Sequence, residues 1–194
     1  MIYSIVQLKD MFGDYANIYE KIKVEEKNQR LVKIKRGLYT DSINENKFFV
    51  ANVLYNPSYV SFETALAFHN VIPERVNIIK SATFKKNKNK VYDTKLGGFY
   101  YQDVNKNAYP FGIEMIEMEG QIILMASKEK ALTDLVSTLS PRNNMKEIEE
   151  LLFDDLRINE YVFDQMNKNL LVELCDLYSS KTLQILKKYI RRHL

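Results

Sequence analysis

Apolar residues recur at helical spacing in two segments near the N-terminus. Ile5, Leu8 and Phe12 predict a short amphipathic helix over residues 4–12, which Gly13 ends. Residues 15–30 contain neither Gly nor Pro, and their apolar positions at i, i+3, i+4 and i+7 predict a second helix with one buried face. That buried face would consist of Tyr15, Ile18, Tyr19 and Ile22. The opposite, outward face would consist of Asn17, Lys21, Val24, Lys27 and Asn28.

The period of the pattern changes to two at residue 32, where apolar and basic residues alternate as far as Lys35. Such alternation is typical of a half-buried strand, and Gly37 is suited to a turn or bulge in a β-ribbon. Two helices followed by a basic ribbon have the order of a compact winged helix. We therefore predict a winged helix at residues 1–42 and a domain boundary near residue 42.

For the rest of the chain, residues 43–194, the sequence pattern predicts a mixed domain with strands at about 76–126 and helices at about 127–192. Two helices are expected before the strands, at residues 47–55 and 62–70, and Ser61 is the expected N-cap of the second. Turn residues between the predicted strands indicate an antiparallel meander of strands at 76–79, 90–95, 99–104, 113–118 and 121–125. Ser127 is the expected N-cap of an apolar-striped helix, which is followed by helices at 144–154, 158–166, 168–178 and 182–192. The predicted fold class is α+β.

Composition and charge narrow the function. The chain has 194 residues, and its 28 Lys and Arg against 25 Asp and Glu give a formal net charge of +3, which leaves room for one basic face. One cysteine and two widely separated histidines exclude a disulfide framework and a Cys-rich zinc site, so neither a metal nor another cofactor is expected. Because no apolar stretch is long enough to span a membrane and the N-terminus lacks a basic signal region, we expect a cytoplasmic protein.

Catalytic motifs are absent from the sequence. It contains no dinucleotide-binding, P-loop, zinc-protease, nucleophile-elbow or EF-hand pattern, and no Gly-Ser dipeptide of the kind that precedes the acids of nucleotidyltransferases. His69 and Cys175 lie among apolar residues and are interpreted as packed side chains. The adjacent acids at 149–150 and 154–155 are interpreted as a solvated helix surface, because neighbouring helix positions point in different directions. We therefore predict no catalytic residue and no enzyme activity.

The strongest positive signal is the segment from Lys27 to Arg36, which holds five cations and no acid. Cations on a rigid element can follow the phosphates of a DNA duplex, and amides on a helix face can read base edges. We therefore predict double-stranded DNA as a partner. The candidate DNA-binding residues are Asn17, Lys21, Lys27, Asn28, Arg30, Lys33, Lys35 and Arg36. A basic surface that only aids solubility is the alternative interpretation.

Three sequence elements resemble one known family. The segment LVKIKRGLY at residues 31–39 resembles the L-x-x-x-x-R-G-x-Y wing of the AbiEi-type antitoxins. YVSFETAL at residues 59–66 is similar to the family's Y-[IV]-S-x-x-x-A-L element, and ASKEKALTD at residues 126–134 is similar to its A-x-x-E-K-A-L-x-D helix. The order and separation of these elements also agree with the family over about residues 15–140.

The resemblance implies an antitoxin of a type IV toxin–antitoxin system, of the kind that takes part in bacterial phage defence. In that family an N-terminal winged helix binds operator DNA in the promoter region and represses the operon. The larger C-terminal domain counteracts a nucleotidyltransferase-like toxin, usually without a stable complex. By the same resemblance, Arg36 is expected to contact phosphate, Gly37 to form a turn and Tyr39 to pack against the second helix.

Two other functions stay open. Residues 147–164 contain seven acids and one base, so a protein-binding antitoxin or adaptor that docks a basic partner through these acidic helices is the first alternative. An enzyme of the nucleotidyltransferase line is the second, and the missing Gly-Ser dipeptide disfavours it.

Overall fold

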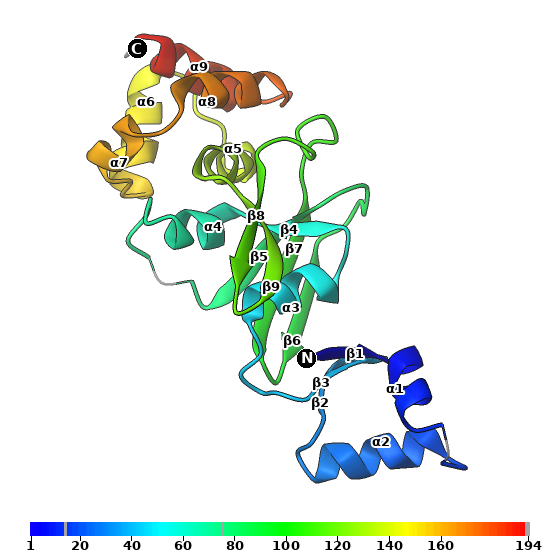
Figure 1. The fold of residues 1–194 in the computed structure, drawn as a ribbon. Helices are drawn as coiled ribbons and strands as arrows, with labels where there is room; N and C mark the ends of the chain where they lie inside the picture. The colour runs from blue at the N-terminus through cyan, green and yellow to red at the C-terminus, as the bar shows by residue number, and fades with distance from the viewer. Residues whose placement is uncertain (14, 75, 193–194) are drawn as a thin grey trace.

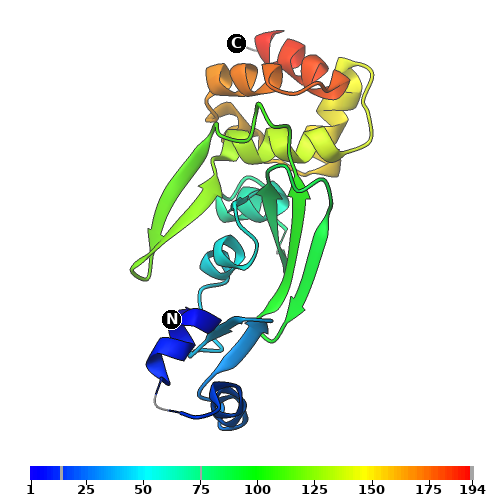
Figure 2. The same cartoon turned by 90° about the vertical axis from the view of Figure 1, so that its right-hand side faces the viewer.

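The computed structural model describes residues 1–13, 15–74 and 76–192, and it has a mixed α+β architecture (Figure 1). A small three-stranded sheet with two helices forms the N-terminal part, a six-stranded mixed sheet forms the centre, and helices form the C-terminal part. The view in Figure 2 shows these three parts one above the other, with the N-terminal helices and the C-terminal helices at opposite ends. The predicted α+β class and the order of its parts are confirmed.

The N-terminal part begins with a strand that the sequence pattern did not reveal. Its elements are β1 (Ile2–Ser4), α1 (Ile5–Met11), α2 (Ile18–Lys27), β2 (Val32–Lys35) and β3 (Leu38–Thr40). The sheet has the order β1-β3-β2, with both pairs antiparallel. Ser4 ends the first strand and caps α1 through a capping box with Gln7, so the helix begins at the residue after this N-cap. Gly37 lies in the β2–β3 turn with φ of +80°, as predicted.

The central sheet is not the antiparallel meander that we predicted. Its strands are β4 (Ser58–Val60), β5 (Ile78–Thr83), β6 (Lys90–Thr94), β7 (Gly97–Asp103), β8 (Ile113–Met118) and β9 (Gln121–Ala126). Their order is β6-β7-β5-β4-β9-β8, in which β5 pairs parallel with β7 and β4 pairs parallel with β9. The turns predicted the β6–β7 and β8–β9 hairpins correctly, since these pairings are local. Both parallel pairs join strands that do not follow each other in the sequence, and β4, which forms one of these pairs, has three residues, too few for its period to be recognised.

The helices largely follow the prediction. They are α3 (Lys47–Leu54), α4 (Phe62–Phe68), α5 (Lys128–Thr138), α6 (Met145–Glu149), the π-helical turn η1 (Glu150–Asp155), α7 (Glu160–Asp164), α8 (Lys168–Asp176) and α9 (Lys181–Arg192). Ser127 caps α5 by accepting a hydrogen bond from the Lys130 N–H, as predicted. Ser61 precedes α4 but makes no side-chain cap, because its hydroxyl group bonds to Asp134 instead. Along the residues that the structure describes, no helix is long and apolar enough to cross a membrane.

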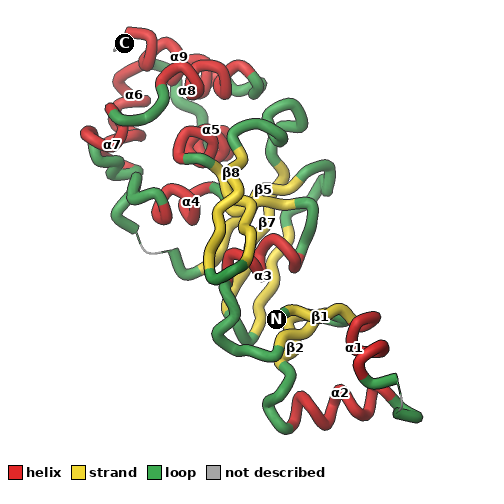
Figure 3. The backbone as a smooth tube through the Cα atoms, viewed as in Figure 1, coloured by secondary structure: helices red, strands yellow, loops and turns green. Residues whose placement is uncertain are grey.

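The β2–β3 hairpin contributes to two hydrophobic cores. Tyr39 and Leu31 pack with Leu8 of α1 and Ile22 of α2 in a small core, which confirms the predicted packing of Tyr39 against the second helix. Val32, Ile34 and Leu38 belong instead to the main core, which also includes the central sheet and the C-terminal helices. Figure 3 shows this small sheet between the N-terminal helices and the rest of the chain. The hairpin therefore attaches α1 and α2 to the body of the molecule.

Candidate nucleic-acid interface

Helix α2 presents a different face to solvent from the one predicted. The helix begins at Ile18, so Tyr15 precedes it and cannot belong to its apolar stripe. Ile22 and Glu25 are buried, whereas Tyr19 is 59% exposed. The outward residues are Tyr19, Glu20, Lys23, Val24 and Lys27. The predicted buried face is therefore wrong in Tyr15 and Tyr19, and Lys27 and Val24 are the predicted outward residues that lie on this exposed helix face.

Glu25 explains why α2 has this orientation. Its carboxylate lies 2.7 Å from the Lys21 ammonium group and 2.9 Å from the Arg30 guanidinium group. The hydrogen bond from Lys21 holds the pKa of the Glu25 carboxyl group below its ordinary value. The Lys21 ammonium group also lies 4.6 Å from the centre of the Tyr15 ring. Lys21, a predicted DNA contact, is thus engaged inside the N-terminal part, while Arg30 is ion-paired but keeps a largely exposed side chain.

The two predicted base-reading amides lie at the ends of α2. Asn17 is the N-cap, and its side-chain oxygen accepts a hydrogen bond of 3.3 Å from the Glu20 N–H. Asn28 is the C-cap, and its backbone N–H donates to the Val24 carbonyl group. Both side chains therefore flank the outward face of the helix and do not form its centre.

Lys35 attaches the hairpin to the body of the molecule. Its ammonium group donates a hydrogen bond to the Leu54 carbonyl oxygen at the end of α3 and lies 5.7 Å from the centre of the Tyr92 ring on β6. Desolvation lowers the pKa of this half-buried ammonium group. Lys35, a predicted DNA contact, is therefore held against the body of the molecule through its side chain.

Three predicted cations are exposed and form no ion pair with any described residue: Lys27, Lys33 and Arg36. Lys27 ends α2, Lys33 lies on β2, and Arg36 lies in the turn of the hairpin. Lys33 also lines an open hollow of about 450 Å³ together with Lys95, which follows β6, and the same hollow is lined by Glu26 and Asp93. The structure therefore divides the predicted residues into solvent-exposed cations and cations that stabilise the fold.

A second basic region was missed at the sequence level. Residues 85–90 contain four lysines and no acid, between β5 and β6. Lys86 lies 4.9 Å from the centre of the Tyr55 ring, Lys90 lies 5.3 Å from the centre of the Tyr92 ring, and the two rings are 5.9 Å apart. With Lys35 these four side chains form what we call the basic–aromatic cluster. The sequence shows these lysines as an acid-free basic segment, but only the central sheet brings the segment close to the β2–β3 hairpin.

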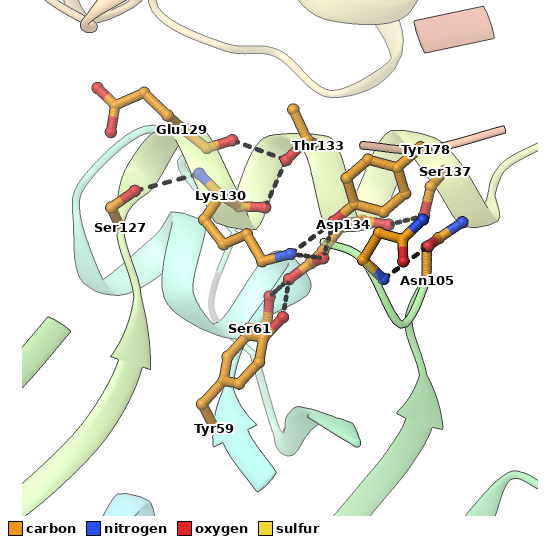
Figure 4. Close-up of polar contacts among 11 residues, drawn as sticks. Tyr59, Ser61, Asn105, Ser127, Glu129, Lys130, Thr133, Asp134, Ser137 and Tyr178 are labelled. Atoms are coloured by element: carbon orange, nitrogen blue, oxygen red, sulfur yellow. Dashed lines mark hydrogen bonds and ion pairs between the residues drawn. The ribbon is translucent and has the colours of Figure 1, made fainter. Parts of the chain in front are cut away.

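The motifs at residues 59–66 and 126–134 meet in the interior (Figure 4). The hydroxyl groups of Tyr59 and Ser61 donate to Asp134 Oδ2 at 2.9 Å and 2.7 Å, and the Tyr178 hydroxyl group donates to Asp134 Oδ1. Lys130 Nζ lies 2.9 Å from Asp134 Oδ1 and donates to the Tyr178 oxygen at 2.6 Å. We call these five residues the Asp134 cluster.

All five residues of the Asp134 cluster are buried. The side chains of Lys130 and Asp134 have 0% exposure. Burial raises the pKa of Tyr59 and of Tyr178, and desolvation lowers the pKa of Lys130. The cluster joins β4, the start of α4, α5 and the end of α8, and within α5 Lys130 and Asp134 form an i,i+4 ion pair.

His69 and Cys175 are packed side chains, as predicted. The His69 Nε2 atom lies 2.9 Å from the Ala126 carbonyl oxygen, next to the end of α4. Cys175 is buried on α8, and burial raises the pKa of its thiol group to about 12. A thiol with so high a pKa is protonated at neutral pH and is a poor nucleophile.

Comparison of the sequence with protein-family models gives no match, and comparison with curated proteins gives none either. The resemblance to the AbiEi-type antitoxins therefore depends on the three motifs.

Proposed function

We propose that this protein is a DNA-binding antitoxin that represses its own operon, as the resemblance to the AbiEi-type antitoxins implies. The observation that carries the DNA-binding part is the N-terminal order of strand, helix, turn, helix and hairpin, with sheet order β1-β3-β2. This arrangement supports a winged helix in which α2 enters the major groove and the β2–β3 hairpin is the wing.

The charge distribution supports the same function. The outward face of α2 carries Lys23 and Lys27, and the hairpin carries Lys33 and Arg36. Lys23 is paired with Glu20, but both side chains are exposed. Because an exposed ion pair contributes little free energy, Lys23 can exchange Glu20 for a DNA phosphate at little cost. The basic–aromatic cluster can extend the phosphate contacts from the hairpin onto β6, since cations beside aromatic rings suit nucleic acids.

The antitoxin part of the proposal concerns residues 43–194. This region is much larger than a DNA-binding module needs, and it contains the two motifs that meet at the Asp134 cluster. The functional partner would be a nucleotidyltransferase-like toxin, counteracted without a stable complex. The cluster would maintain the fold that this activity requires.

The DNA-binding proposal is tested by fluorescence anisotropy with a labelled duplex from the region upstream of the gene. The variant combines Lys27→Gln, Lys33→Gln and Arg36→Gln, and the charge-matched control combines Lys106→Gln, Lys146→Gln and Lys188→Gln at exposed positions in the other parts of the fold. We expect the variant to bind more than about tenfold more weakly at moderate salt and to lower the salt slope by about 2 to 3, because each phosphate contact releases about one counterion. Equal affinities of the variant and the control would overturn the interface.

The antitoxin proposal is tested by expressing the full chain beside the neighbouring toxin gene and measuring growth. The same triple variant is expected to restore growth as the unaltered chain does, because its substitutions lie outside the region proposed to counteract the toxin. Restored growth without co-purification of the toxin would support the type IV function. Failure of the unaltered chain to restore growth would overturn the antitoxin part and leave the DNA-binding result standing.

One observation favours a protein-binding antitoxin as the second candidate. Glu149, Glu160 and Asp164 from the acidic helices 147–164 line one hollow of about 220 Å³, which Lys168 of the same chain also lines. Because the three acids outnumber this one lysine, a basic side chain of a partner would fit the hollow by charge. In that case the toxin would co-purify with the chain, and replacing the three acids by their amides would abolish both co-purification and growth.

A further inference from the structure

Strand β8 is a free edge of the central sheet. It pairs with β9 on one side only, and the two strands are joined by a turn at Glu119 and Gly120, with Met118 opposite Gln121. In an antiparallel hairpin, residues alternate between those bonded to the partner strand and those whose backbone groups point away. Counting from the turn, the N–H and C=O groups of Met115 and Glu117 point away from β9 and toward the open edge.

The opposite edge of the same hairpin is covered. Where β4 ends, the Asn52 side chain accepts a hydrogen bond of 2.7 Å from the Leu124 N–H and donates one of 3.1 Å to the Leu124 carbonyl oxygen. No described residue covers the edge of β8 in this way. The uncovered backbone groups are therefore available to an added strand.

One face of this hairpin is apolar and exposed. Met115 lies opposite Leu124, and Ile122 lies opposite Glu117, so these four side chains share a face. Met115 is 77% exposed and Ile122 is 62% exposed, whereas Ile123 on the other face is fully buried. In Figure 2 the hairpin, coloured yellow-green, projects from the body of the molecule as an arm. An exposed apolar strand at a sheet edge is a feature that proteins usually avoid unless the strand has a partner.

The charge of this edge indicates the kind of partner. Glu114, Glu117 and Glu119 are exposed, and among the described residues none of them forms an ion pair. A second copy of the chain paired at this edge would bring two sets of these carboxylates together, which is unfavourable. Lysine or arginine side chains opposite the glutamates would instead form stabilising cross-strand pairs.

We propose that β8 binds an extended, basic segment of a partner protein as an additional strand. The uncovered N–H and C=O groups supply the main-chain hydrogen bonds, Met115 packs against an apolar side chain of the added strand, and Glu114 and Glu117, on opposite faces of β8, select basic side chains. This surface is independent of the proposed DNA interface, because β8 and β6 lie at opposite edges of the sheet and β6 is the strand beside the N-terminal hairpin.

The proposal is tested with a short fluorescein-labelled Val–Lys peptide that contains the segment Lys-Val-Val-Lys, titrated with the full chain and followed by anisotropy. This segment can place Val opposite Met115 and Lys opposite both Glu114 and Glu117. Met115→Pro removes an N–H that points to the open edge and leaves the pairing with β9 intact. Val91→Pro is the matched control, since Val91 is 62% exposed and occupies the corresponding outward position on the other edge strand, β6. We expect Met115→Pro to weaken binding more than about tenfold and Val91→Pro to leave it unchanged, because strand addition depends on main-chain hydrogen bonds.

A second pair of variants tests the charge. Glu114→Gln with Glu117→Gln is expected to weaken binding of the Val–Lys peptide, and a Val–Glu peptide is expected not to bind. Asp10→Asn with Glu173→Gln, at exposed positions outside the acidic helices, removes the same charge elsewhere and should change nothing. Three outcomes would overturn the proposal. The first is that the peptide does not bind, and the second is that only the charge control loses binding. The third is that the chain forms a dimer which Met115→Pro dissociates.

Discussion

The Asp134 side chain is fully buried and contacts four polar partners. Lys130 supplies a charge, and the hydroxyl groups of Tyr59, Ser61 and Tyr178 supply hydrogen bonds, so the desolvation of the carboxylate is offset by several contacts at once. These contacts come from segments that are far apart in the sequence. The Asp134 side chain therefore acts as a junction between the sheet and the helices.

Replacing Asp134 by Asn should strongly destabilise the protein. The change leaves the buried Lys130 ammonium group without its counter-charge, and removal of one partner from a buried pair typically costs about 3–5 kcal/mol. Asp155→Asn is the control, because the pair of Asp155 with Arg142 is partly exposed and should contribute about 1 kcal/mol or less. Urea unfolding followed by circular dichroism measures both values. Similar midpoints for the two variants would contradict the role assigned to the cluster.

At the scale of elements, the start of β8 and helix α5 approach each other closely. The Gly112 carbonyl oxygen, just before β8, accepts a hydrogen bond of 2.8 Å from the N–H of Ser127, the N-cap of α5. A Cβ atom on Gly112 would lie 2.8 Å from the Cβ atom of Lys130. The absence of a side chain at Gly112 is therefore what permits the strand to pass beside the first turn of the helix.

The pair Gly112→Ala and Gly120→Ala separates this close approach from backbone strain. Both glycines have a positive φ, of +69° and +74°, but a Cβ atom on Gly120 would meet nothing within 4 Å. We expect Gly120→Ala to cost about 1–2 kcal/mol of stability from the left-handed backbone alone. Gly112→Ala should cost about 1–3 kcal/mol more, because the helix must also shift. Thermal and urea unfolding give the difference, and equal losses would show that the contact with Lys130 is easily relieved.

At the scale of the whole molecule, the N-terminal part and the body share a core. Val32, Ile34 and Leu38 of the hairpin pack in the main core, while Tyr39 and Leu31 of the same hairpin pack in the small core under α1 and α2. A hairpin that belongs to both cores makes the unfolding of one part expose apolar surface of the other. The predicted boundary near residue 42 thus lies in a chain whose two sides are joined by packing.

Differential scanning calorimetry should therefore show one unfolding transition for the full chain. Ile34→Ala removes buried apolar groups where the hairpin packs in the main core, and it is expected to cost about 2–5 kcal/mol and to move the whole transition to lower temperature. Val6→Ala, at an exposed position of α1, is the control and should leave the transition in place. Two separate transitions, of which Ile34→Ala moves one, would indicate independently stable domains.

The sequence by itself determined the local structure of this protein. Helical and alternating periods, together with capping residues such as Ser127 and turn residues such as Gly37, predicted most helices and the β2–β3, β6–β7 and β8–β9 hairpins, because these features depend on neighbours a few residues away. Apolar neighbours in the sequence likewise predicted that the side chains of His69 and Cys175 are packed.

Only the tertiary structure decided which strands are parallel, which face of α2 is outward and which cations are exposed. A parallel pair places β4 beside β9, which is distant in the sequence, and the burial of Glu25 rotates α2 so that Lys21 turns inward. The same long-range packing brings Lys35 into contact with α3 and leaves Lys33 exposed. The sequence does not distinguish the two lysines, because both occupy basic positions in the same alternating segment. The physical reason is that burial and ion pairing depend on contacts between distant segments, and periodicity within a segment carries no information about them.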